Sequence, residues 1–269
     1  MSADINDTSQ TENFVSANGI KIYYESVGSG KSLIFLHGAM GTSQVWKPYV
    51  PILSNDFNII LPDVRGHGKT ENPGKKIDLH LMADDIAALI DALKLDKPFL
   101  CGWSGGGDIG LDIAIRYPDC VSRLIVGGVI LRVTEAARAT LMAMGLEGPG
   151  QINFEQAEKA IPQLTNVWKK EHVQSPLHWK ELLTQVSFEM INPTLPAEDD
   201  LKQINVPTLI IWGDRDQFLP VEDAVELYRL IPNAQLAVVP NADHFVTRTN
   251  VRSFAELVKE FVLSNKHAG

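Results

Sequence analysis

The segment LCGWSGGGDIG, residues 100–110, fits two different catalytic patterns. Read from Gly105, it spells G-x-G-x-x-G, which is typical of a loop that holds a dinucleotide pyrophosphate. Read from Gly102, it spells G-x-S-x-G, a sharp turn that exposes Ser104 as a nucleophile. The first pattern predicts a cofactor-dependent oxidoreductase and the second predicts a hydrolase, so the surrounding residues have to decide between them.

The dinucleotide pattern lacks the context that it needs. Its glycine loop should open the first β-α-β unit, and an acidic residue should end the next strand about 20 residues on to bind the ribose. Here the loop comes well into the chain, and the next apolar run, RLIVGGVILR, contains no Asp or Glu. We therefore expect no dinucleotide and no other cofactor.

The serine pattern has its full context. KPFLCGWSGGGDIGLDIAIRYP places an apolar strand, a tight turn and a helix directly after one another. The strained serine turn needs small residues two positions before and after the nucleophile, and these are Gly102 and Gly106. Trp103 is expected to pack behind the turn. The pattern predicts that Ser104 is a nucleophile at the end of a strand.

A serine needs a histidine to take its proton and a carboxylate to orient that histidine. His244, in PNADHF, and Asp216, in WGDRDQFLP, each follow an apolar strand-like run. The carboxyl ends of parallel strands share one edge of a sheet, so both side chains are expected near the serine. Asp214 remains an alternative on the same turn as Asp216. Asp243 is not expected to orient His244, because adjacent side chains in an extended segment diverge.

The elements that must position these residues follow an alternating α/β pattern. Residues 13–26 predict a hairpin that turns at Asn18-Gly19. Six continuous apolar runs then predict strands buried on both faces of a parallel sheet: SLIFLHG, FNIILPDV, PFLCGWS, RLIVGGVI, VPTLIIWGD and AQLAVVP. Helical periodicity appears in residues 79–95, and a second helix is expected from Gly105 to Tyr117, where Pro118 ends it.

The strand signal lapses between about residues 132 and 200, where only helix-like segments rich in Trp and Met are present. We therefore expect a core of residues 14–131 and 200–265, interrupted by a helical cap of residues 132–199. Residues 1–13 are expected to form a disordered tail.

Five motifs in this order resemble the α/β-hydrolase superfamily, from Phe14 to about Leu263. They are the HG pair at His37, the D-x-R-G-x-G turn from Asp63, the serine turn, the G-x-x-D turn from Gly213 and the late histidine. The resemblance implies an α/β-hydrolase fold with a mostly parallel eight-stranded sheet, helices on both faces and a helical cap insertion.

Two backbone N–H groups are expected to stabilise the oxygen that becomes negative during the reaction. One belongs to Gly105, which directly follows the nucleophile. The resemblance implies that the second belongs to Ala39, with Met40 as the alternative. It also makes His37 a structural histidine beside this loop, and His67 belongs to the RGHG turn. The remaining histidines carry no motif and are expected at the surface or satisfied in the core: His80, His172, His178 and His267.

The resemblance implies that the cap covers the active site and shapes an apolar substrate pocket. Core packing is the alternative role for each side chain expected there. These side chains are Met40, Trp46, Met142, Met144, Trp168, Trp179, Phe188, Met190, Phe218 and Phe245.

The resemblance leaves several reactions open. The leading expectation is hydrolysis of a small or medium carboxylic ester or lactone through an acyl-enzyme on Ser104. The alternatives are a carbon–carbon bond hydrolase of a dienoate ketone, a cofactor-free perhydrolase and a hydrolase-fold receptor for a small molecule. The carbon–carbon hydrolases usually have Asn before the serine and Trp after the histidine, whereas this chain has Trp103 and Phe245.

The composition of the chain further limits the kinds of molecule that the protein is expected to bind. The formal net charge of -9 argues against nucleic acid. No apolar run approaches the roughly 20 residues that span a bilayer, and the polar start MSADINDTSQTEN is not expected to act as a secretory signal. Two cysteines, Cys101 and Cys120, do not make a disulfide framework. We expect a cytoplasmic monomer or homodimer that acts on a small molecule, with no nucleic acid, membrane or metal.

Overall fold

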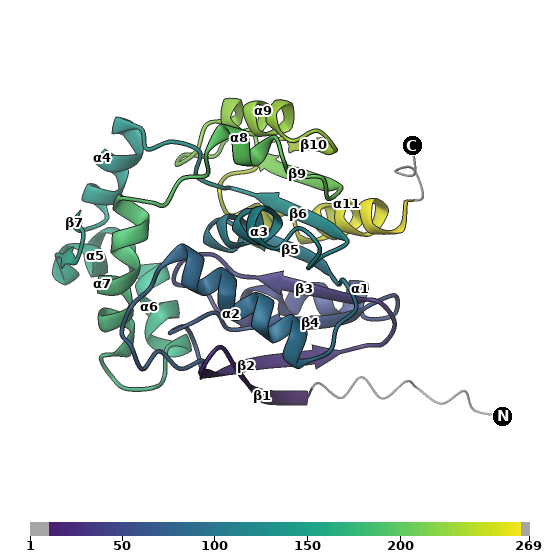
Figure 1. Cartoon of the computed structure of the whole chain (residues 1–269). Helices are drawn as coiled ribbons and strands as arrows, with labels where there is room; N and C mark the ends of the chain where they lie inside the picture. Colours follow the sequence, from purple (N-terminus) through teal and green to yellow (C-terminus); the bar gives the residue numbers. More distant parts are fainter. Residues whose placement is uncertain (1–10, 265–269) are drawn as a thin grey trace.

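The computed structural model describes residues 11–264, and an eight-stranded sheet forms its centre (Figure 1). From one edge to the other the strands are β1 (Thr11–Ala17), β2 (Ile20–Val27), β4 (Asn58–Pro62), β3 (Ser32–Leu36), β5 (Phe99–Trp103), β6 (Arg123–Gly127), β9 (Thr208–Gly213) and β10 (Ala234–Val239). The β1–β2 and β2–β4 pairs are antiparallel, and every later pair is parallel. The predicted mostly parallel eight-stranded sheet is confirmed.

The apolar runs form strands because both faces of the sheet are covered. In β3, Leu33 and Phe35 belong to one core cluster, whereas Ile34 and Leu36 belong to the other. All four side chains are fully buried. An alternating strand with one polar face could not occupy this place, since either face would bring polar groups into a core.

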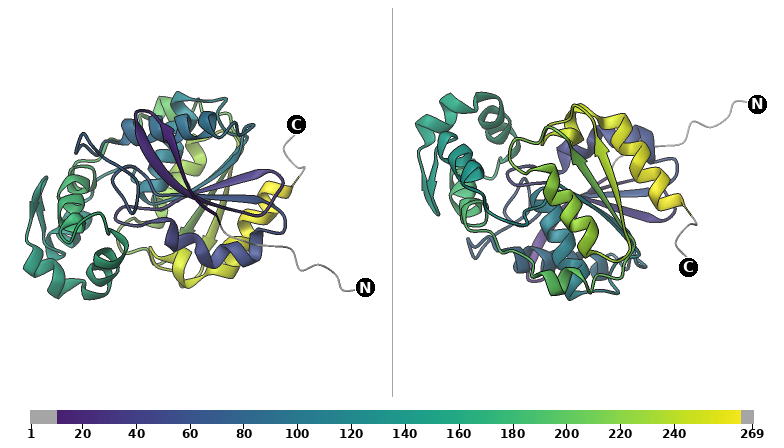
Figure 2. Two further views of the ribbon diagram at one scale, coloured as in Figure 1. Left: turned by 90° about the horizontal axis from the view of Figure 1, so that it is seen from below. Right: turned by 90° about the horizontal axis from the view of Figure 1, so that it is seen from above.

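Helices pack on both faces of the sheet (Figure 2). The first core cluster includes side chains of α2 (Leu79–Ala92), α3 (Gly105–Arg116), α8 (Glu198–Leu201) and α9 (Val221–Leu230). The second includes side chains of the 3-10 helix η1 (Ser43–Tyr49), α1 (Val50–Leu53), α10 (Val246–Thr249) and α11 (Val251–Leu263). No helix within residues 11–264 is long and apolar enough to cross a membrane.

The N-terminal hairpin forms as predicted, with the turn at Asn18 and Gly19, both at positive φ (46° and 75°). The disordered tail was expected to extend to residue 13, and this bound is wrong. β1 begins at Thr11, and the backbone of residues 11–13 pairs with β2. Backbone pairing at a sheet edge does not require apolar side chains, which is why the polar sequence gave no sign of it. Residues 1–10 lie outside the described residues.

The insertion between β6 and β9 lies beyond one end of the sheet, as the teal and green ribbons show (Figures 1 and 2). It contains α4 (Glu135–Ala143), β7 (Leu146–Gly148), β8 (Gln151–Ile152), α5 (Phe154–Ala160), α6 (Pro162–Glu171) and α7 (His178–Ile191). The short β7–β8 hairpin was not expected, because its strands are too brief to show a two-residue periodicity. The long segment NFEQAEKAIPQLTNVWKKEH is two helices, since Pro162 starts a new one.

Candidate active site

Ser104 lies between the end of β5 and the start of α3, with φ 55° and ψ −127°. Its amide donates a hydrogen bond to the Gly127 carbonyl at 2.8 Å. Neither glycine beside the turn has room for a side chain: a β-carbon on Gly102 would collide with the Gly106 carbonyl, and one on Gly106 with the Leu36 carbonyl. Packing therefore requires both glycines, and the strained backbone holds Ser104 at the carboxyl end of the strand.

The imidazole of His244 is held by Asp216. Asp216 Oδ2 lies 2.7 Å from His244 Nδ1. The other oxygen of the carboxylate accepts hydrogen bonds from the amides of Phe218 (2.9 Å) and Leu219 (3.0 Å). With both oxygens engaged, the carboxylate has a fixed orientation, and it directs the Nδ1–H tautomer of the histidine.

The two rival carboxylates point elsewhere. Asp214 Oδ1 accepts a hydrogen bond from the Ala242 amide at 3.3 Å. Asp243 Oδ1 accepts one from the Phe245 amide at 2.8 Å. Of the acids that the sequence left open or set aside, it is Asp216 that contacts the imidazole.

Trp103 packs in the core behind the serine turn, as expected, but it also borders the cavity beside Ser104 and contacts the histidine segment. Its ring lies 5.6 Å from that of Phe254 between centroids, and its Nε1–H donates to the His244 carbonyl at 2.9 Å. Trp103 therefore ties the turn that carries the serine to the loop that carries the histidine.

The two predicted oxyanion amides lie next to each other. A β-carbon built on Gly105 would be 3.3 Å from the Ala39 nitrogen, and one built on Gly38 would be 2.9 Å from Ser104 Cβ. The alternative, the Met40 amide, already donates to His67 Nε2 at 3.3 Å. Ala39 and Gly105 are thus the pair of amides placed beside Ser104, with Met40 engaged elsewhere.

His37 and His67 form hydrogen bonds that hold the loop around Ala39 and Met40 in place. His37 Nε2 accepts from the Val64 amide at 3.1 Å, and burial lowers the pKa of His37 to about 4. His67 uses Nε2 to accept from Met40, so its Nδ1 carries the hydrogen and donates to the Arg65 carbonyl at 3.0 Å. Burial and the neighbouring imidazoles hold the pKa of His67 well below its ordinary value. Both rings are therefore neutral at pH 7, as their accepting nitrogens require.

His172 and His178 carried no motif, yet both join the insertion to the core. His172 Nδ1 accepts from the Gly68 amide at 3.0 Å, and its Nε2–H donates to the Met40 carbonyl at 3.1 Å. Burial lowers the pKa of His172 to about 4. His178 Nε2–H donates to the Gly66 carbonyl at 2.8 Å. Nothing in the local sequence marks these histidines, because their partners lie more than a hundred residues away.

A cavity of about 230 Å³ opens beside Ser104 and His244, and its wall is mostly apolar. Seven of the predicted pocket residues line it: Met40, Trp46, Met144, Trp168, Met190, Phe218 and Phe245. Of these, Trp46 also packs deep in the second core cluster, against Phe35, Tyr49 and Phe254.

Three predicted pocket residues do not line the cavity. Trp179 is 2% exposed and packs edge-on against Phe154 inside the insertion, with the ring centroids 5.7 Å apart. Met142 and Phe188 are 56% and 52% exposed. Each lies two residues before a methionine that does line the cavity, and two residues turn a helix by about 200°. The prediction was wrong for these three because several apolar residues lie on different faces of each helix.

The cavity also has four charged side chains in its wall that the sequence did not single out: Asp108, Arg132, Glu189 and Arg248. Asp108 lies in the first turn of α3, four residues after Ser104, and this nearness in the sequence was the one available signal. Burial, followed by the charge of Glu189, raises the pKa of Asp108 to about 7.

Comparison with known proteins agrees with this arrangement. A family model described as the alpha/beta hydrolase family matches residues 33–257. A pyrrolizixenacetamide deacetylase from Xenorhabdus hominickii is 25% identical, over 94% of this chain and 98% of its own. A 2-hydroxy-6-oxo-2,4-heptadienoate hydrolase from Pseudomonas putida is 28% identical, over 92% of this chain and 95% of its own.

Solved structures agree as well. A meta-cleavage product hydrolase from Pseudomonas fluorescens, 25% identical, superposes with a TM-score of 0.78 over 93% of this chain and 97% of its own. The matched segment runs from β3 to within α11, so it includes every residue of the site described above. The chain therefore belongs to the alpha/beta hydrolase family.

Proposed function

We propose that this protein hydrolyses a small or medium carboxylic ester or lactone through an acyl-enzyme on Ser104. The observation that carries the proposal is the convergence of three groups on one cavity: the strained serine, the His244 imidazole held by Asp216, and the paired amides of Ala39 and Gly105. Together these groups supply a nucleophile, a base and stabilisation of an oxyanion. Location in the cytoplasm stays a prediction.

In the first half-reaction, Ser104 Oγ attacks the carbonyl carbon of the ester while His244 Nε2 accepts the hydroxyl proton. The carbonyl oxygen becomes negative, and the amides of Ala39 and Gly105 donate hydrogen bonds to it. Asp216 stabilises the imidazolium that forms. The tetrahedral intermediate then breaks its bond to the alcohol oxygen, which takes the proton from His244 and leaves.

In the second half-reaction, water takes the place of the alcohol. His244 removes a proton from the water, whose oxygen bonds to the acyl carbon. The second tetrahedral intermediate expels Ser104 Oγ, which recovers its proton from His244, and the carboxylic acid departs. The small, mostly apolar cavity favours a short or medium acyl or alcohol group.

Carbon–carbon bond hydrolysis is the second candidate, and the names of two relatives support it. The Pseudomonas putida relative and a 2-hydroxy-6-oxo-6-phenylhexa-2,4-dienoate hydrolase from Burkholderia cepacia, 26% identical over 94% of this chain, are both named for dienoate substrates. Against it stand Trp103 and Phe245, where those enzymes usually have Asn and Trp. These two side chains are why we place ester hydrolysis first.

A substrate panel separates the candidates. The purified protein is assayed with 4-nitrophenyl esters of increasing acyl length, with simple lactones and with dienoate ketones, and Ser104→Ala serves as the control. We expect turnover of esters or lactones that Ser104→Ala abolishes. Cleavage of a dienoate ketone with no turnover of any ester would replace ester hydrolysis by carbon–carbon hydrolysis. Binding without turnover of any class would instead support a receptor.

Covalent labelling tests the nucleophile independently of the substrate. A fluorophosphonate reacts with an activated serine, so we expect it to modify Ser104 alone and Ser104→Ala to remain unlabelled. Peptide mass spectrometry locates the modification. If another serine is modified, Ser104 is not the nucleophile.

A further inference from the structure

Among the charged side chains in the wall of the cavity, some form ion pairs and others do not. Two carboxylates, Asp108 from the core and Glu189 from the insertion, line the same mostly apolar space as Ser104. Burial, and to a lesser extent the charge of Glu189, raises the pKa of Asp108. Two carboxylates that share a mostly apolar space repel each other unless a group of opposite charge joins them.

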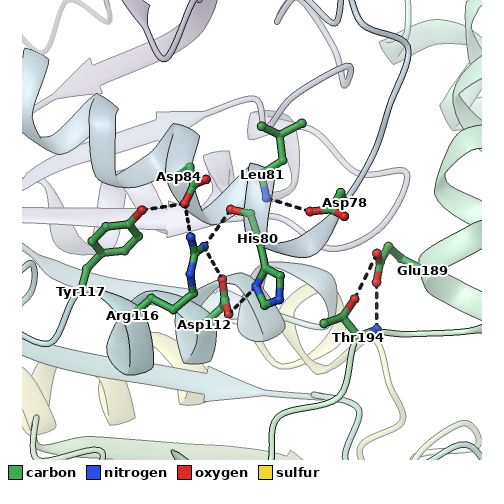
Figure 3. Close-up of polar contacts among 9 residues, drawn as sticks. All are labelled: Asp78, His80, Leu81, Asp84, Asp112, Arg116, Tyr117, Glu189 and Thr194. Atoms are coloured by element: carbon green, nitrogen blue, oxygen red, sulfur yellow. Dashed lines mark hydrogen bonds and ion pairs between the residues drawn. The ribbon is translucent and has the colours of Figure 1, made fainter.

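Asp108 has no partner of opposite charge among residues 11–264. Its Oδ1 accepts a hydrogen bond from the Ile130 amide at 2.9 Å, and its Oδ2 has no partner in that range. The next acid on the same face of α3 differs. Asp112 has one oxygen 2.9 Å from His80 Nδ1 and the other 3.1 Å from an Arg116 nitrogen, as Figure 3 shows. One helix thus carries a compensated acid outside the cavity and an uncompensated one inside it.

Glu189 is held in place, but its charge is not neutralised. Its Oε2 accepts from the Thr194 amide at 3.0 Å, and its Oε1 accepts from the Thr194 hydroxyl at 3.4 Å (Figure 3). No Lys, Arg or His of the described chain forms an ion pair with it. The contacts with Thr194 fix the carboxylate without removing its negative charge.

The two arginines in the cavity wall do not supply the missing charge. Arg132 is occupied by Asp223, with Nε 2.9 Å from Oδ1, and by Glu226. Arg248 is exposed and lies over the Phe245 ring, 5.9 Å from its centroid. Neither forms an ion pair with Asp108 or Glu189, so both acids lack a cationic partner within residues 11–264.

We propose that Asp108 and Glu189 form a subsite for a protonated amine, so that the preferred substrate is an ester that carries an ammonium group. An ammonium donates charge-assisted hydrogen bonds to both carboxylates and offsets their repulsion. Asp108 follows Ser104 by only four residues and lines the same cavity, so one small substrate can place its ammonium at this subsite and its carbonyl at Ser104. This proposal rests on ester hydrolysis at Ser104.

The test compares substrates that differ in charge but hardly in shape. The pairs are the 4-nitrophenyl esters of 3-aminopropanoate and butanoate, those of 6-aminohexanoate and heptanoate, and the acetates of 3-aminopropan-1-ol and butan-1-ol. We expect kcat/KM for the ammonium member of at least one pair to exceed that of its neutral partner by about 10- to 100-fold, the range of a hydrogen bond to a charged group. The pair that responds assigns the subsite to the acyl or the alcohol side.

Substitutions then connect that preference to the two acids. Asp108→Asn keeps the oxygen that accepts from the Ile130 amide but removes the charge, and Glu189→Gln does the same beside Thr194. Each is expected to bring the preference close to one, because the charge-assisted hydrogen bond is lost for the ammonium member of the pair alone. The matched controls are Asp112→Asn in α3 and Glu181→Gln in α7, which remove the same charge outside the cavity and should leave the preference intact.

Other results would overturn the proposal. One such result is that the enzyme prefers the neutral ester in every pair. Another is that the preference for the ammonium ester persists in both Asp108→Asn and Glu189→Gln. If no ester is hydrolysed at all, the proposed function fails separately. The subsite is then tested by the rate at which Ser104 reacts with fluorophosphonates that carry an aminoalkyl or an alkyl chain. Faster labelling by the aminoalkyl reagent supports the subsite, and equal rates refute it.

Discussion

At the residue scale, the proposed chemistry depends on how Asp216 is fixed. One oxygen faces His244 Nδ1, and the other accepts two backbone amides. Asp214, only two residues earlier, instead bonds to a backbone amide in the loop before the histidine. The two carboxylates thus share a turn but differ in role: one orients the imidazole, and the other ties the loops together.

Replacement of each acid by its amide separates these roles. Asp216→Asn presents an NH₂ group to His244 Nδ1 and favours the wrong tautomer, so we expect kcat to fall by about 10³- to 10⁴-fold, by analogy with serine proteases. Asp214→Asn keeps an oxygen for the Ala242 amide and should change kcat little. Steady-state kinetics on one activated ester measures both. A large loss in Asp214→Asn with a mild effect of Asp216→Asn would reverse the assignment.

At the scale of the elements, the insertion contributes one wall of the cavity, and α4, α6 and α7 each do so with one face. Trp168 in α6 lines the cavity, whereas Trp179 in α7 is turned toward Phe154 inside the insertion. Both side chains are nearly inaccessible, at 6% and 2% exposure, so burial alone does not distinguish them. The difference lies in what each ring contacts.

Alanine substitutions should reveal this difference. Trp168→Ala removes an apolar contact from the distal part of a substrate, so we expect relative kcat/KM among acyl lengths to change by roughly 10- to 200-fold, with little effect on an acetyl ester. Trp179→Ala leaves a void in the insertion and should lower stability by about 3–5 kcal/mol. The measurements are an ester length series and thermal unfolding.

If Trp179→Ala does not fold, Trp179→Phe, which leaves a smaller void, is measured in its place. Equal losses on short and long esters in Trp168→Ala would mean that Trp168 supports the fold rather than the substrate.

At the scale of the whole molecule, buried polar contacts attach the insertion to the core beside the oxyanion loop. His172 connects the end of α6 to Gly68 and Met40, and Glu171 accepts a hydrogen bond from the Thr42 hydroxyl at 2.7 Å. The His172 contacts need a neutral ring, because Nδ1 must accept from an amide. Attachment of the insertion is therefore linked to pH.

The direction of this linkage follows from the pKa of His172, which burial lowers from 6.5 to about 4. Between these values the unfolded chain binds a proton that the folded chain does not, so His172 contributes stability that is complete above about pH 6.5 and is lost as pH falls toward 4. The loss reaches about 3 kcal/mol. His172→Gln can accept and donate like the neutral imidazole but does not titrate.

Urea unfolding of wild type and His172→Gln at several pH values measures this contribution. We expect the stability of wild type relative to the variant to fall between pH 7 and pH 4. The other titratable groups are the same in both proteins, so their contributions to the pH dependence of stability cancel in the comparison. One of them is Asp108, whose raised pKa makes stability increase as pH falls. Parallel pH curves for the two proteins would show that His172 has no such role.

The sequence by itself determined the order along the chain of the eight strands of the sheet, the serine turn, and the loops that carry Asp216 and His244. These features are local: an apolar run buried on both faces, a glycine forced by a close backbone contact, and a polar residue directly after a strand. Each can be recognised within about ten neighbouring residues. The hairpin at Asn18 and Gly19 is predictable for the same reason.

Only the tertiary structure decided which side chains meet across the cavity. Helical periodicity tells which residues share a face, but in the insertion apolar residues occupy several faces, so it could not separate Trp168 from Trp179. Asp108 and Glu189 come together because the insertion folds back over the end of the sheet, and His172 finds its partners for the same reason. These contacts join residues far apart in the chain, and their energies depend on burial and charge that no local pattern contains.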